Sequence, residues 1–130
     1  MRRLFLTSVL AGVLAAIAVV SASAQPSGWS SNYFHSPSGN IRCREFVNRN
    51  LMACLTLNDH FAVMVPLRGR ARKQLDVADW QFPHGPVLAY GESWTHAGRF
   101  ECRSESSGMS CWSLVSGRGF FIERYSYDLF

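Results

Sequence analysis

Apolar residues in this chain occur in short runs that are separated by turn-forming Gly, Pro, Asn and Ser residues. The runs cover residues 41–47, 51–57, 61–65, 87–90, 100–103, 109–115 and 120–125. Several are rich in β-branched or aromatic residues, and tight-turn sequences such as Ser116-Gly117-Arg118-Gly119 separate them. Short strands at such intervals predict an all-β fold, either a small antiparallel sandwich or a barrel-like meander of hairpins.

The pattern in the middle of the chain has two interpretations. Pro66 ends the run at 61–65, and Arg68-Gly69 could turn the chain back into a strand at 70–75. A short helix over 71–80 is the alternative. The segment DWQFPHGP at 79–86 contains too much Pro and Gly for either element, so we expect a loop there.

The first residues have the pattern of an export signal. Arg2 and Arg3 precede an almost wholly apolar segment, 4–20, and Ala22-Ser23-Ala24 offers the small residues that signal peptidase requires. We expect a signal peptide at 1–24 with cleavage before Gln25, a short linker at 25–33 and one β-domain at 34–130. An uncleaved membrane anchor is the alternative. The export route, general secretion or twin-arginine, stays open.

The four cysteines all follow the predicted signal, and an even number in an oxidising compartment indicates two disulfides. Hairpin register selects the pairing. A turn centred on Asn48-Arg49 places Cys43 opposite Cys54, and a turn centred on Ser106-Ser107 places Cys102 opposite Cys111. Directly opposed residues lie close enough for a disulfide to join them. Zinc binding is a weaker alternative, because neither pair has the usual ligand spacing.

Several short motifs occur in order along nearly the whole exported part. They are Phe34-x-Ser-Pro-Ser-Gly-Asn-Ile-x-Cys43, Cys54, Leu88-Ala-Tyr-Gly91, Phe100-x-Cys-x-Ser104, Gly108-x-x-Cys111, Ser116-Gly-x-Gly-Phe120 and Tyr127-x-Leu-Phe130. This pattern resembles a domain-of-unknown-function family of small secreted bacterial proteins. The resemblance implies a fold and an extracytoplasmic location, but no activity. Arg118 stands where the family usually has histidine, and arginine cannot serve as a general base near neutral pH.

A search for catalytic or metal-binding spacing gives no candidate. His35, His60, His84 and His96 are scattered, and the serines that precede glycines do not form a G-x-S-x-G sequence. We therefore predict no catalytic residue, cofactor or metal. A cryptic site in which His84 or His96 meets a serine or carboxylate is the alternative, and it would make the protein a small envelope hydrolase.

Charge and aromatic residues near predicted loops suggest binding instead. Without the two signal arginines, eleven basic residues face nine acidic ones, so the exported chain has a net charge of only +2. This near balance argues against general nucleic-acid binding. The densest positive cluster comprises Arg68, Arg70, Arg72 and Lys73, and it would suit an acidic envelope component, glycan or secreted protein. A solvated strand edge is the other interpretation.

Trp80 and Trp94 lie near predicted loops, where aromatic side chains often contact sugars or proteins. A domain this small also needs aromatic side chains for its core, so burial is the alternative. Together with the basic cluster, these two residues form the predicted partner-binding set. The sequence therefore predicts an exported β-domain that acts as a binding or inhibitor module of the cell envelope.

Overall fold

The structure, a computed structural model, describes Trp29 and residues 31–130. The predicted signal peptide and most of the predicted linker lie outside the described residues. Within the part described, no helix is long and apolar enough to cross a membrane.

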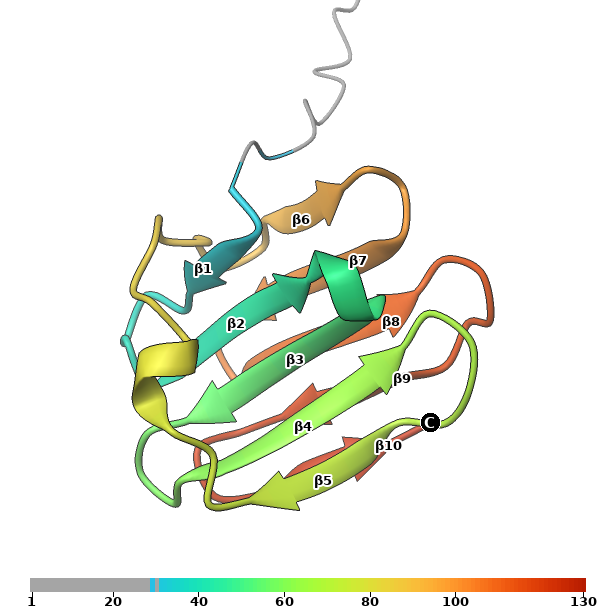
Figure 1. Cartoon of the computed structure of the whole chain (residues 1–130). Coiled ribbons are helices and arrows are strands. Elements are labelled where there is room, and N and C mark those ends of the chain that lie inside the picture. Colours follow the sequence, from blue (N-terminus) through green and yellow to red (C-terminus); the bar gives the residue numbers. More distant parts are fainter. Residues whose placement is uncertain (1–28, 30) are drawn as a thin grey trace, which may run out of the picture.

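The described chain forms two antiparallel sheets of five strands each, which lie face to face (Figure 1). Sheet A contains β1 (Tyr33–His35), β2 (Ile41–Phe46), β3 (Leu51–Thr56), β4 (Phe61–Pro66) and β5 (Arg72–Leu75), in that spatial order. Sheet B contains β6 (Ser93–His96), β7 (Phe100–Glu105), β8 (Gly108–Ser113), β9 (Gly119–Ile122) and β10 (Tyr127–Leu129), also in chain order. The predicted all-β sandwich is confirmed.

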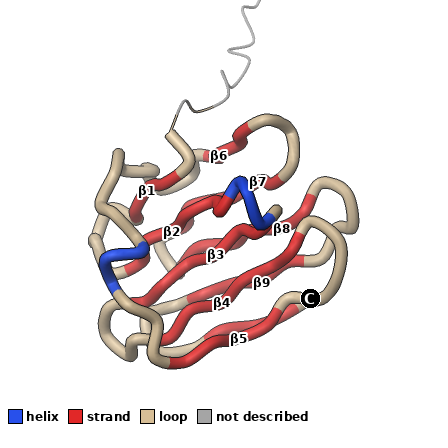
Figure 2. The backbone as a smooth tube through the Cα atoms, in the orientation of Figure 1, coloured by secondary structure: helices blue, strands red, loops and turns tan. Residues whose placement is uncertain are grey.

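Two single 3-10 turns interrupt this pattern, η1 (Val47–Arg49) after β2 and η2 (Asp79–Gln81) after β5 (Figure 2). The turn η1 ends at Asn50, whose φ of 48° is left-handed. Asparagine tolerates that conformation better than most residues do. The β2–β3 connection comprises the four residues between Phe46 and Leu51, and it is centred on Asn48-Arg49 with the predicted register.

Both disulfides join directly opposed residues of a hairpin, as predicted. Cys43 pairs with Cys54 across β2 and β3, and Cys102 pairs with Cys111 across β7 and β8. The two bonds meet in the middle of the sandwich, where the Sγ atoms of Cys54 and Cys111 are 3.7 Å apart. Around them lies the inner core, which includes Phe34, Trp94, Phe100 and Phe120.

Sheet A is unusual because β3 and β4 are buried on both faces. Strand alternation directs Leu51, Ala53 and Leu55 away from sheet B, and these residues form a second apolar cluster with Ala62, Met64 and Phe82. Phe82 follows η2, so the segment after β5 folds back over the outer face of sheet A. This cover is what creates a pocket there.

Two expectations for the middle of the chain are resolved. The strand after Arg68-Gly69 forms as β5, and the alternative helix over 71–80 does not. The expected strand at 87–90 is wrong, because only Val87 makes a bridge, parallel to His35. Pro86 precedes it and has no N–H to donate, so the ladder does not extend in that direction.

Candidate functional site

The predicted basic cluster does not form one patch. Arg68 and Arg70 lie in the turn between β4 and β5, and Arg72 pairs with Met64 of β4, whose side chain belongs to the outer apolar cluster. Lys73 is the next residue along β5, so its side chain points to the opposite face. There its ammonium lies 4.9 Å from the ring centre of Phe61 and 5.0 Å from that of Tyr127.

Positive charge gathers instead around Arg49, which lies at the end of η1. Arg49 lines three neighbouring hollows with volumes of about 210, 190 and 250 Å³. Arg44 lines the first, Arg72 the second and Arg68 the third. We call Arg44, Arg49, Arg68 and Arg72, together with Phe46, the Arg49 surface.

The ring of Phe46 contacts two of these arginines. The guanidinium of Arg44 lies 4.7 Å from the centre of the Phe46 ring, and that of Arg49 lies 5.5 Å from it. Arg44 Nη1 also donates to the backbone oxygen of Gln81 at 2.9 Å, which ties β2 to η2. The Phe46 ring meets Phe82 edge to face at 5.8 Å. Cation–π contact therefore holds two positive charges beside an apolar pocket.

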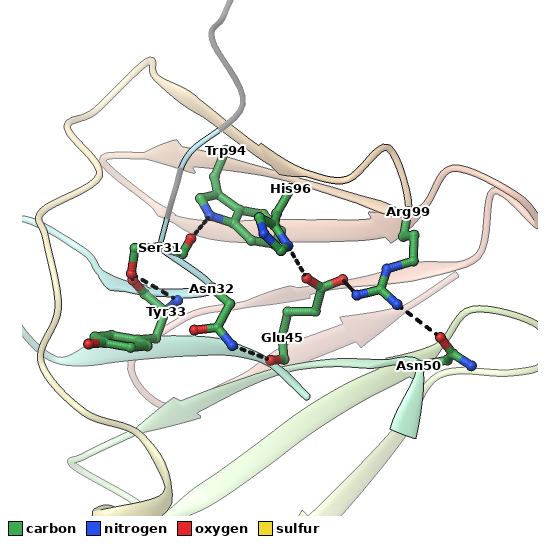
Figure 3. A network of polar contacts seen from close by, with 8 residues as sticks. All are labelled: Ser31, Asn32, Tyr33, Glu45, Asn50, Trp94, His96 and Arg99. Atoms are coloured by element: carbon green, nitrogen blue, oxygen red, sulfur yellow. Dashed lines mark hydrogen bonds and ion pairs between the residues drawn. The ribbon is translucent and has the colours of Figure 1, made fainter. Parts of the chain in front are cut away.

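Among the described residues that line the three hollows, Glu45 is the one acidic residue. Its side chain has no exposed surface, because strand alternation turns it from β2 toward sheet B. Glu45 Oε1 lies 2.7 Å from His96 Nδ1, and Oε2 forms an ion pair with Arg99 Nη2 at 3.0 Å (Figure 3). Its charge is therefore compensated inside the sandwich.

The same network reaches η1. Arg99 Nη1 donates to the side-chain oxygen of Asn50 at 3.1 Å, and Asn32 Nδ2 donates to the backbone oxygen of Glu45 at 3.3 Å (Figure 3). A chain of polar contacts thus links the hairpin β6–β7 to Glu45 of β2 and to Asn50, the residue that follows η1. These contacts hold the chain on both sides of the turn that carries Arg49.

The two predicted tryptophans lie in different environments. Trp80, in η2, is 80% exposed. Trp94 has no exposed surface and donates from its indole nitrogen to the backbone oxygen of Ser31 at 2.9 Å. Trp80 is therefore available to a partner, while Trp94 packs in the core and supports the strand that carries His96.

The histidines are mostly engaged in structural contacts. His84 Nε2 accepts from Arg42 Nη2 at 2.8 Å, and His35 Nδ1 lies 2.6 Å from the backbone oxygen of His84. His60 lies 3.3 Å from Asp79 at the surface. His96 is the one described histidine beside a buried carboxylate, and no serine hydroxyl of the described chain is within hydrogen-bond distance of its ring.

Two turns that contain a Ser-Gly pair, Ser38-Gly39 and Ser107-Gly108, line one pocket. Ser36 and Ser38 from one turn, and Ser106 and Ser107 from the other, line a shallow polar pocket of about 120 Å³ with Tyr90 and Arg124. Ser36 Oγ accepts a hydrogen bond from the backbone N–H of Ile41 at 3.3 Å, where β2 begins. Ser36 and Ser38 thus stabilise their turn, and Glu105 also lines this pocket, but no described hydrogen bond joins it to any of the four serines.

Three sulfurs form the one described cluster with the spacing of a metal site, those of Cys43, Cys54 and Cys111. All three belong to disulfides. Thiolates, rather than disulfide sulfurs, are the usual cysteine ligands, so the cluster is explained by the packing of the two bonds.

Comparisons of this chain with protein-family models, curated proteins and solved structures found no match. The family resemblance suggested by its motifs stays a prediction. Functional inference therefore depends on the surface and its chemistry.

Arg44, Phe46 and Arg49 were absent from the set predicted by sequence. Alternation along β2 does place Arg44 and Phe46 on one face, which is a visible signal. The position of Arg49 beside Arg72 depends on the pairing of β2, β3, β4 and β5, and that pairing brings together residues that local charge density does not connect.

Proposed function

We propose that the chain is an exported, non-enzymatic binding module of the cell envelope, which holds an acidic partner through the Arg49 surface. The observation that carries this proposal is the gathering of four arginines around three hollows whose one acidic lining residue, Glu45, is buried and paired with Arg99. Two disulfides in a domain of this size agree with an oxidising compartment.

The near balance of the remaining charges makes this local excess effective. The predicted exported chain has eleven basic and nine acidic residues. In the described chain, no carboxylate lies within ion-pair distance of Arg49, Arg68 or Arg72. These guanidinium groups are therefore free to approach an anion, and their mutual repulsion falls when an acidic partner binds.

The proposal is tested by binding of the disulfide-bonded protein to dextran sulfate, an acidic polysaccharide, at low and high salt. Arg49→Glu should weaken binding on the order of fivefold to tenfold at low salt, because it reverses one exposed charge. Arg124→Glu is the matched control, since Arg124 is exposed, forms no ion pair within the described chain and lines none of the three hollows. Equal binding by Arg49→Glu, Arg124→Glu and the parent protein would contradict the proposal.

A second function, a small envelope hydrolase, is favoured by one contact. His96 Nδ1 lies 2.7 Å from a buried carboxylate, an arrangement that orients the imidazole of many general bases. Ester and glycoside substrates would test it. Activity that His96→Gln abolishes without loss of folded structure would select the hydrolase over the binding module.

A further inference from the structure

The most enclosed of the three hollows has two chemically different sides. We call it the outer pocket, because it lies on the outer face of sheet A beneath the segment that follows β5. Its volume is about 190 Å³. Apolar cavities of about 150 Å³ are large enough to bind benzene, so this pocket has room for a six-membered ring or a short acyl chain.

The register of sheet A explains its chemistry. Arg44 pairs with Ala53, Ala53 with Met64, and Met64 with Arg72, so these four residues form one row across β2, β3, β4 and β5. Their side chains share the outer face. The row has an arginine at each end and two apolar residues between them, and the apolar pair forms part of the pocket floor.

The walls continue this division. Phe46 and Val77 continue the apolar lining, and both are partly exposed. Arg49 and Arg72 line the pocket, while Gln74 and Gln81 contribute amide groups. No lining residue of the outer pocket is acidic. An occupant therefore meets an apolar floor and two guanidinium groups together.

We propose that the outer pocket binds a small amphipathic carboxylate, with the apolar tail against Phe46, Met64 and Val77 and the carboxylate between Arg49 and Arg72. This inference deepens the proposed function and rests on it, because it names one ligand class for the Arg49 surface. Guanidinium groups suit carboxylates, which they can bind through two parallel hydrogen bonds. An apolar floor of this size supplies the affinity that an exposed charge pair alone does not.

The test uses octanoate as the probe, with octanol and acetate as matched controls. Octanol keeps the tail without the charge, and acetate keeps the charge without the tail. Octanoate should bind at least about tenfold more tightly than either control in titration calorimetry, because the pocket recognises both parts. Equal binding of octanol and octanoate would overturn the proposal.

The methionine methyl groups locate the binding. Met64 lines the outer pocket, whereas Met52 and Met109 belong to the inner core. In the protein labelled with ¹³C-methyl methionine, millimolar octanoate should shift the Met64 resonance and leave those of Met52 and Met109 in place. An unchanged Met64 resonance at that concentration would also overturn the proposal.

Two variants separate the roles of the head group and the tail. Arg72→Gln, at an exposed position, should weaken octanoate binding about fivefold. Val77→Glu puts a carboxylate at a partly exposed position of the lining and should abolish it, whereas Arg70→Gln should have no effect. If octanoate fails to bind while dextran sulfate still depends on Arg49, this inference alone is overturned. If both probes fail, the proposed function is overturned as well.

Discussion

Glu45 Oε1 lies 2.7 Å from His96 Nδ1, and the two residues come from different sheets. Glu45 belongs to the inner face of sheet A, where its neighbours on β2 are apolar. Burial of a carboxylate costs free energy unless cations and hydrogen bonds compensate for it. His96 and Arg99 provide that compensation, and their contacts with Glu45 join the two sheets at the end of β2 that leads into η1.

The first prediction concerns this buried carboxylate. Glu45→Ala should lower the free energy of unfolding by about 3–5 kcal/mol, because it removes one member of a buried charge network and leaves His96 and Arg99 without their acceptor. Urea denaturation measures the change. Glu92→Ala is the control, since Glu92 is exposed and should change stability by less than about 0.5 kcal/mol. Equal stabilities of the two variants would mean that the network contributes nothing.

The second prediction concerns the left-handed residue at the end of η1. Asn50 has φ 48°, and its side chain accepts from Arg99 Nη1 at 3.1 Å. Asn50→Ala should destabilise the protein by about 1–3 kcal/mol, because it loses this bond and strains the backbone. Asn50→Gly loses the bond without the strain and should be the milder variant. Thermal denaturation of both variants checks the order, and the reverse order would contradict the role of φ.

The third prediction concerns the disulfides. Replacing either cysteine pair by two alanines should lower the free energy of unfolding by about 3 kcal/mol, because each bond closes a short loop in the unfolded chain. Removing both pairs should not give the sum of the two losses, since Cys54 and Cys111 are in contact at 3.7 Å. Denaturation of the two double variants and the quadruple variant measures the coupling. Strict additivity would show that the two bonds act independently.

The fourth prediction compares steric crowding at Gly119, the first residue of β9, with backbone conformation at Gly117 in the turn before it. A Cβ at Gly119 would overlap the backbone oxygen of Cys111 and lie 2.7 Å from Trp112 Cβ. Gly119→Ala should therefore cost about 1–3 kcal/mol.

Gly117 has open space around it but φ +73°. Asn should be tolerated there better than Ala, because it adopts that conformation more readily. Urea denaturation of the three variants checks both statements. A neutral Gly119→Ala would mean that β8 and β9 separate more easily than their close pairing indicates.

Most of the fold could be predicted from the sequence, because the features that determine the fold are local. The two cysteine pairs lie opposite each other across single hairpins, so turn position alone predicted their register. The apolar runs gave most of the strands. The segment after β5 was harder to predict, because Phe82 packs on the outer face of sheet A and nothing in its local pattern of Pro and Gly indicates that contact.

Less of the candidate site could be predicted from the sequence. Arg68, Arg70, Arg72 and Lys73 are adjacent in sequence, but alternation along β5 directs Arg72 and Lys73 to opposite faces. Arg49 is far from Arg72 along the chain. The pairing of β2 to β5 in sheet A brings the two residues to the same pocket. The ion pair of Glu45 with Arg99 joins the two sheets, and it was not predicted either.

The division of the strands between the sheets has a consequence for the covalent chain. Every strand of sheet A precedes residue 76, and every strand of sheet B follows residue 92. Neither disulfide crosses between the sheets. A single cut beside exposed Trp80 would leave both strand meanders complete, and the buried interface would still join the two fragments. The two meanders thus resemble two associating subunits. The segment that connects them gives each meander a high effective concentration for binding the other.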